Sequence, residues 1–63
     1  MIEHVATITF KDAESFDEAV AIVRRDENAV VLCLSVRHGS DVQVVMGKTD
    51  ATKLLEALRT AIS

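Results

Sequence analysis

The longest apolar segment of the chain, Ala29–Arg37, constrains the fold more than any other feature. It is rich in Val and contains neither Gly nor Pro. Because side chains alternate across a strand, one face would carry Val30, Leu32, Leu34 and Val36, and the other Val31, Cys33 and Ser35. The first set is typical of a core face. The second is small and half polar, as expected for a strand covered on both faces. The segment is predicted to be the strand around which a sheet is built.

Two other segments are predicted to be strands. Ile2–Phe10 alternates apolar and polar side chains and is rich in Thr, Val and Ile, which favours a strand with one buried face. Val42–Met46 follows the central segment after a short polar turn at His38–Asp41, where Gly39 is expected to supply a positive φ. The last two strands are therefore predicted to form a hairpin.

Two segments are predicted to be helices. Ser15–Glu18 matches a capping box, in which a hydroxyl and a Glu three residues later satisfy backbone N–H groups. The apolar side chains around it follow the spacing of one helical stripe: Phe16, Ala19, Val20 and Val23. A second helix, capped by Thr49 or Asp50, carries a longer stripe: Ala51, Leu54, Leu55, Leu58 and Ile62.

These elements predict one small α+β domain over residues 1–63. The order is β-α-β-β-α, giving a three-stranded sheet with both helices packed on one face. Two strand orders satisfy this pattern. The three predicted strands are numbered here in chain order. Order 1-3-2 makes all neighbours antiparallel, which is the commoner pairing, whereas order 3-2-1 places the most hydrophobic strand, Ala29–Arg37, at the centre.

Size and composition predict self-association. A chain of 63 residues buries only about 60% of the surface that its unfolded form exposes, and one cysteine excludes an intramolecular disulfide. Apolar residues make up 49% of the chain and the mean hydropathy is +0.25, which is high for so small a domain. Since such domains are commonly stabilised by a staple or by a second chain, a homodimer is expected.

The sheet face without helices is the predicted self-association surface. It is expected to carry no charge, whereas a solvated antiparallel face normally carries several. Its predicted contact residues are Val5, Thr7, Val31, Cys33 and Val45. Pairing of strand edges across a two-fold axis is the alternative route to a dimer.

Charge limits the classes of partner. Ten acidic and seven basic residues give a net charge of −3, which disfavours non-specific binding to nucleic acid or to anionic membranes. No apolar stretch approaches the roughly 20 residues that span a bilayer. The segment Met1–His4 lacks the basic start of a signal peptide. A cytoplasmic location is expected.

The sequence offers no convincing catalytic or cofactor site. Cys33 is predicted to lie on the opposite sheet face from His4 and His38, out of reach for a nucleophile–base pair. The histidines are expected at opposite ends of the sheet, which excludes a shared metal ion. Gly47-Lys48-Thr49 matches the end of a phosphate-binding loop, but the first Gly of that motif is replaced by Val42. A protein without enzymatic activity, cofactor or metal is expected.

The predicted function is therefore protein binding, as in an accessory, adaptor or inhibitor protein of a bacterium or phage. The predicted partner-binding residues are the acidic ones around the first helix start: Asp12, Glu14, Asp17 and Glu18. They suit the helix dipole and would also dock on a basic surface. The alternative is a small anion- or nucleic-acid-binding site made by Arg24, Arg25, Arg37 and Lys48.

Overall fold

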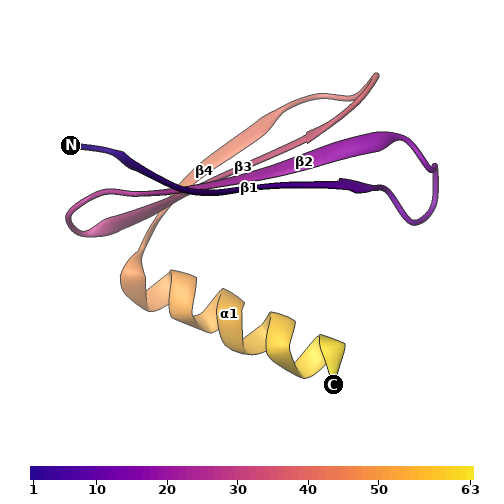
Figure 1. The fold of residues 1–63 in the computed structure, drawn as a ribbon. Helices are drawn as coiled ribbons and strands as arrows, with labels where there is room; N and C mark the ends of the chain where they lie inside the picture. Colours follow the sequence, from indigo (N-terminus) through magenta and orange to yellow (C-terminus); the bar gives the residue numbers. More distant parts are fainter.

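The chain folds into a four-stranded antiparallel sheet followed by one helix (Figure 1). The computed structural model describes all residues from 1 to 63. The elements in chain order are β1 (Glu3–Lys11), β2 (Glu18–Arg25), β3 (Ala29–Val36), β4 (Val42–Gly47) and α1 (Lys48–Ile62). The predicted three-stranded sheet with two helices is therefore wrong, although the class remains α+β.

The error lies in one segment, because the first predicted helix is strand β2. Its centre, Ala19–Val23, is an unbroken apolar run in which three of five side chains are β-branched. Such side chains favour strands, because they pack well on a pleated surface. The predicted helical stripe includes only Ala19, Val20 and Val23 of this run, and it leaves the apolar Ile22 on the polar side of the helix. The whole run instead fits an internal strand, which β2 is.

The capping box is also reassigned, because its Ser15, together with Asp12 before it, stabilises a hairpin turn. Asp12 Oδ1 accepts hydrogen bonds from the backbone N–H of Glu14 at 2.8 Å and of Ser15 at 2.9 Å. Ser15 Oγ accepts one from Asp17 N–H at 3.3 Å. Phe16 has a φ of 63°, which lies outside the right-handed helical region. Side chains that cap helices also close turns, so this local signal fits both structures.

The Asp12 turn is expected to weaken in acid. The N–H groups of Ser15 and Glu14 lower the pKa of the Asp12 carboxyl below its ordinary value. A lowered folded-state pKa stabilises the turn above the ordinary pKa, and this stabilisation is lost as pH falls through the folded-state value. In an NMR titration, the Asp12 carboxyl carbon and the Glu14 and Ser15 amides should shift together, below the pH at which a free aspartate titrates. Asp12→Asn should abolish the amide shifts, and an ordinary midpoint would contradict the prediction.

The strands form a simple meander in the order β1-β2-β3-β4, with every neighbouring pair antiparallel. Both predicted strand orders, 1-3-2 and 3-2-1, are wrong because they lack β2. Strand β3, which covers most of the predicted strand Ala29–Arg37, is internal and lies between β2 and β4, a position that only order 3-2-1 gave to this segment. The turn after β3 is confirmed, but His38 rather than Gly39 takes the positive φ, at 68°.

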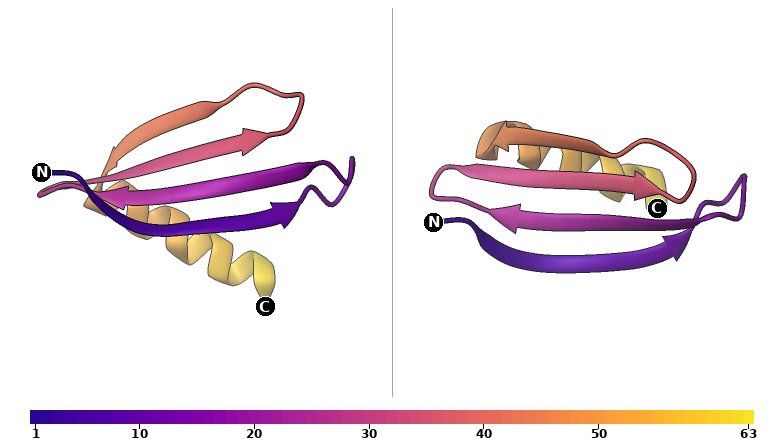
Figure 2. Two further views of the ribbon diagram at one scale, coloured as in Figure 1. Left: turned by 45° about the horizontal axis from the view of Figure 1, so that its top comes forward. Right: turned by 90° about the horizontal axis from the view of Figure 1, so that it is seen from above.

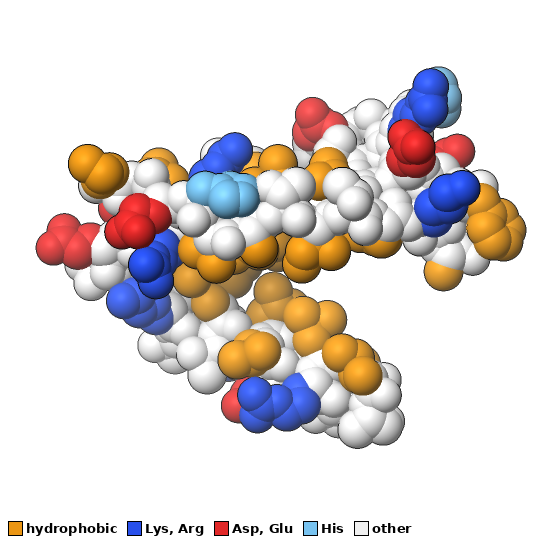
Figure 3. Space-filling model, viewed as in Figure 1, with side chains coloured by type: hydrophobic (Ala, Val, Ile, Leu, Met, Phe, Trp, Pro, Cys, Tyr) orange, Lys and Arg blue, Asp and Glu red, His pale blue; other side chains and the backbone are white.

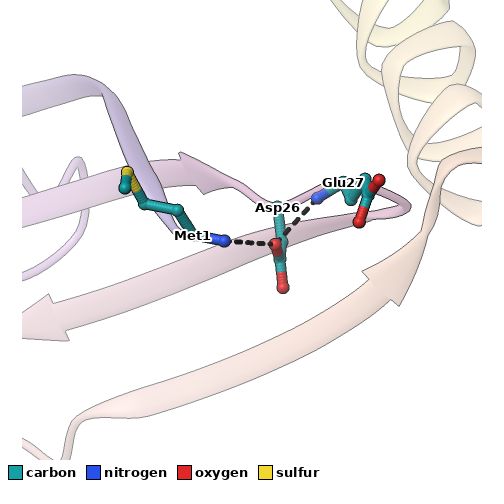
Figure 4. Close-up of polar contacts among 3 residues, drawn as sticks. All are labelled: Met1, Asp26 and Glu27. Atoms are coloured by element: carbon teal, nitrogen blue, oxygen red, sulfur yellow. Dashed lines mark hydrogen bonds and ion pairs between the residues drawn. The ribbon is translucent and has the colours of Figure 1, made fainter.

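Two contacts fix the start of β1 to the turn between β2 and β3. The N-terminal amine of Met1 lies 3.6 Å from Asp26 Oδ1, which also accepts a hydrogen bond from Glu27 N–H (Figure 4). Arg25 pairs with Glu3 at 3.3 Å. Between these contacts and the rest of β1, the register shifts by one residue, so Val5 forms a bulge.

Cross-strand partners share a face, so the register defines two faces of the sheet. The helix-side face carries Ala6, Ile8, Phe10, Ala19, Ala21, Val23, Val30, Leu32, Leu34, Val36, Val42, Val44 and Met46, and also the ion pair of Glu3 and Arg25 at one end. The opposite face carries His4, Thr7, Thr9, Lys11, Glu18, Val20, Ile22, Arg24, Ala29, Val31, Cys33, Ser35, Gln43, Val45 and Gly47.

The helix begins directly after β4, without a connecting loop. Gly47 is its N-cap, and no side chain caps it, so the predicted cap at Thr49 or Asp50 is wrong. Seen from above, α1 lies beneath the β3–β4 half of the sheet (Figure 2), and its contacts are with these two strands. It is neither long nor apolar enough to cross a membrane.

The chain encloses almost no core. Only Ala19 and Val31 are buried. The accessible surface is 5146 Å², whereas a compact protein of 6.9 kDa exposes about 4,000 Å². The radius of gyration is 12.7 Å, against about 11 Å for a compact chain of this length. The sheet and the helix are well formed, but they leave their apolar sides exposed.

Candidate interaction surfaces

Most of the exposed large apolar side chains lie in a wedge between the helix-side face and α1. Figure 3 shows apolar side chains along both walls of the gap. We define the apolar wedge by its exposed large side chains, which are Ile8, Phe10, Leu34, Val42 and Val44 on the sheet, and Leu54, Leu55, Leu58 and Ile62 on the helix. Contiguous apolar surface of this kind is characteristic of contact sites in small proteins.

The wedge is closed at one end and open at the other. At the closed end, the first turns of α1 meet β3 around a hollow of about 260 Å³, lined by Val30, Lys48, Ala51, Thr52 and Leu55. Along the helix the exposed fraction then rises from 53% at Leu55 to 84% at Ile62. The helix therefore contacts its own sheet through its first turns only.

Charged side chains occur in the wedge only near its closed end, where Lys48 lines the hollow and Arg25 and Glu3 lie on the same sheet face as Val30. Two ion pairs run along α1, between Lys53 and Asp50 at 4.0 Å and between Arg59 and Glu56 at 3.8 Å. All four side chains are exposed, so these pairs add little stability. They do leave the apolar stripe of α1 free of charge, which suits burial of the stripe against another apolar surface.

The predicted self-association residues lie on the opposite face or, in the case of Val5, at its edge. Val5 is the bulged residue of β1, and Thr7 bonds the His4 ring at 3.2 Å. Val31 is only 5% exposed, whereas its cross-strand partner Val45 is 62% exposed.

The opposite face also differs in composition from the prediction. Strand β2 adds Val20, Ile22 and Arg24 to it, and sequence reasoning missed these residues because it placed them in a helix. Arg24, Glu18 and Lys11 give this face charges, so the prediction that it carries none is wrong. The Arg24 side chain reaches across to Cys33, with Arg24 Nη1 lying 4.0 Å from Cys33 Sγ.

Cys33 and the two histidines remain far apart. The Cys33 thiol donates a hydrogen bond to Gln43 Oε1 at 3.1 Å. His4 pairs with Arg24 near one end of the sheet, and His38 lies in the β3–β4 turn at the other end. The bulge at Val5 places His4 on the opposite face, so the prediction that it lies on the core side is wrong. The geometry offers neither a Cys–His pair nor a site shared by both histidines.

The predicted acidic cluster lies in the β1–β2 loop, residues 12–17, and at the start of β2. Asp12, Glu14 and Asp17 are in the loop, whereas Glu18 begins β2 and pairs with Arg37 at 3.7 Å. Phe16 lies among them with 73% of its surface exposed. Sequence reasoning missed it as a surface residue, because its spacing matched a helical stripe. A large aromatic side chain among carboxylates was the available signal.

The basic residues do not form one site. Arg24 and Arg25 are neighbours on β2, so they point to opposite faces of the sheet. Arg25 and Lys48 lie near the same end of the sheet, whereas Arg37 follows β3 at the other end. Glu3 and Glu18 pair with Arg25 and Arg37. The four cations are therefore dispersed and partly neutralised.

An open hollow of about 580 Å³ lies beside the β1–β2 loop. It is lined by residues of β1, β2 and β3 and by Arg37 after β3; the lining includes Phe10, Glu18, Ala19 and Ser35.

Comparison with models of protein families, with curated proteins and with solved structures found no match. The most prominent surfaces of the chain are thus the apolar wedge and the acidic β1–β2 loop.

Proposed function

We propose that this chain is a non-enzymatic protein-binding module that acts as a homodimer. One observation carries the proposal: the chain exposes roughly 1,100 Å² more surface than a compact protein of its mass. Much of that surface is the apolar wedge, and removal of apolar surface from water is the main driving force of association.

The size of the excess suits a pair of identical chains. If each copy hides this surface against the other, about 2,200 Å² is buried in total, which is in the range of obligate homodimers. Obligate interfaces are also the more hydrophobic class, resembling a domain core divided between two chains. The single chain buries only Ala19 and Val31, which supports this interpretation.

The β1–β2 loop is the proposed site for a different protein. In a dimer it is present twice, and it combines Phe16 with the carboxylates of Asp12, Glu14 and Asp17. Exposed aromatic side chains supply binding energy at interfaces, while charge guides the approach of an oppositely charged partner. The expected partner surface is basic and has an apolar pocket for one ring. A module of this kind serves as an accessory, adaptor or inhibitor protein.

The positions of the reactive groups support a role without catalysis. The Cys33 thiol is engaged with an amide oxygen, and neither histidine contacts it. A nucleophile needs a base within hydrogen-bond reach, and these residues do not provide one.

The loop assignment predicts a selective loss of binding. A variant with Phe16→Ser, Glu14→Lys and Asp17→Lys should capture at least about tenfold less of the partner than the unchanged chain, because both the aromatic anchor and the charge complementarity are removed. The measurement is affinity capture from cells that contain the protein, quantified by mass spectrometry.

The matched control is Asp50→Lys with Glu56→Lys, which changes the net charge by the same amount on the outer side of α1. It should retain the partner. Equal losses with both variants would attribute binding to net charge alone, and full retention by the loop variant would contradict the loop assignment. A chain that captures no protein would contradict the protein-binding function.

A further inference from the structure

We propose that the two copies complete their cores reciprocally, with the second half of α1 from each copy packed on the β1–β2 half of the partner's helix-side face. The contacts assigned to this interface are Leu58 and Ile62 on the helix, and Ile8 and Phe10 on the sheet. The inference rests on the proposed homodimer and specifies which surfaces form it.

The width of the sheet requires a second helix. Strands lie about 4.8 Å apart, and an α-helix with its side chains is about 10 Å wide, so one helix covers about two strands. The chain has four strands and one helix, and that helix contacts β3 and β4 only. The β1–β2 half of the helix-side face is therefore bare, and it carries Ile8 and Phe10, both about half exposed.

The helix cannot cover this half of its own sheet. It starts at Gly47 without a loop, so its first turn is fixed next to β3 and β4. From there it runs away from the sheet, and the gap widens toward the C-terminus (Figure 1). Ala51 and Leu55 line the hollow against the chain's own sheet, whereas Leu58 and Ile62 do not, and they are 53% and 84% exposed.

The surfaces are complementary in number and in character. Each copy has one uncovered half-sheet and one uncovered half-helix, and a two-fold axis satisfies both at once. The stripe of α1 is one-sided, with Thr60 on the face opposite to Leu58. Two helices side by side on the sheets would therefore keep their charged sides, including the Lys53–Asp50 and Arg59–Glu56 pairs, in water.

A pair of oppositely charged variants tests the contact between chains. Leu58→Asp and Ile8→Lys should each raise the dimer dissociation constant at least about 100-fold, because each places a charge in an apolar contact that occurs twice. Mixing the two variants should restore a particle of twice the 6.9 kDa chain mass by light scattering. In the mixed dimer one helix–sheet contact is unchanged, and the other joins the introduced aspartate with the introduced lysine.

Thr60→Asp is the matched control, since it adds the same charge to the outer side of the same helix, and it should remain dimeric. A mixture that stays monomeric would overturn the reciprocal contact. A dimer that tolerates Leu58→Asp and Ile8→Lys would also overturn it, while leaving the homodimer itself intact. If the unchanged chain is monomeric at all concentrations, the homodimer of the proposed function fails as well.

A measurement on the unchanged chain covers the case in which a variant does not fold. Copies labelled with carbon-13 are mixed with unlabelled copies, and isotope-filtered NMR detects contacts between chains only. Contacts between methyl groups of Leu58 or Ile62 and side chains of Ile8 or Phe10 are expected. Contacts between chains that involve Val45 and Thr7 instead would assign the dimer to the opposite face and overturn the inference.

Discussion

Val31→Lys is expected to lower the free energy of unfolding by about 3 kcal/mol or more, enough to unfold a marginal domain. Val31 is 5% exposed and lies directly opposite Arg24 on the neighbouring strand. A lysine there would remove its ammonium group from water and place it beside another cation. Chemical denaturation followed by circular dichroism measures the loss.

Val45→Lys is the matched control, because Val45 is the other cross-strand neighbour of Val31 and is 62% exposed. It should change the unfolding free energy by no more than about 0.5 kcal/mol and leave the dimer intact. Comparable losses at the two positions would contradict the burial difference. Dissociation of Val45→Lys without unfolding would show that the opposite face is the self-association surface.

Leu55→Ala is expected to have the second large effect, because the side chain lies where the wedge closes. In the single chain it is 53% exposed, so truncation there costs only part of a fully buried leucine. Once a second copy covers the wedge, the loss should rise to about 2–5 kcal/mol per site, and each dimer contains two sites. The predicted consequence is a dimer that dissociates and unfolds together.

Denaturation at two protein concentrations separates these contributions. For the unchanged chain the midpoint should rise with concentration, since association stabilises the folded state by mass action. Leu55→Ala should lower the midpoint at both concentrations, whereas Thr60→Ala should leave it close to that of the unchanged chain. A midpoint independent of concentration would contradict coupled folding and association.

The strands β1, β3 and β4 and the C-terminal helix could be predicted from sequence because each has one unambiguous pattern. Residues 42–47 follow a short polar turn as a β-branched run, and α1 carries a complete stripe from Ala51 to Ile62. Strand β2 could not be recognised by spacing alone, because Ala19–Val23 is apolar at every position and matches both periods. The run of Val and Ile was the better guide, and the turn around Asp12 mimicked a helix start.

That single reassignment also explains why the apolar wedge was not foreseen. With residues 15–25 as a helix, two helices would cover three strands and the helix-side face would be closed. With residues 18–25 as strand β2, the sheet has a fourth strand and only one helix to cover it. In the loop, Glu14 is exposed and Asp12 and Asp17 are partly exposed, whereas Phe16 has a positive φ and is 73% exposed.

The two edges of the meander differ in how well they resist unwanted strand addition. Strand β1 contains a bulge and charged or ionisable side chains near both ends, at Glu3, His4 and Lys11. Strand β4 has no charged residue between Val42 and Gly47 and no bulge. Strand addition from another chain is therefore disfavoured at β1 but not at β4, so fibril-like stacking of this protein would begin at β4.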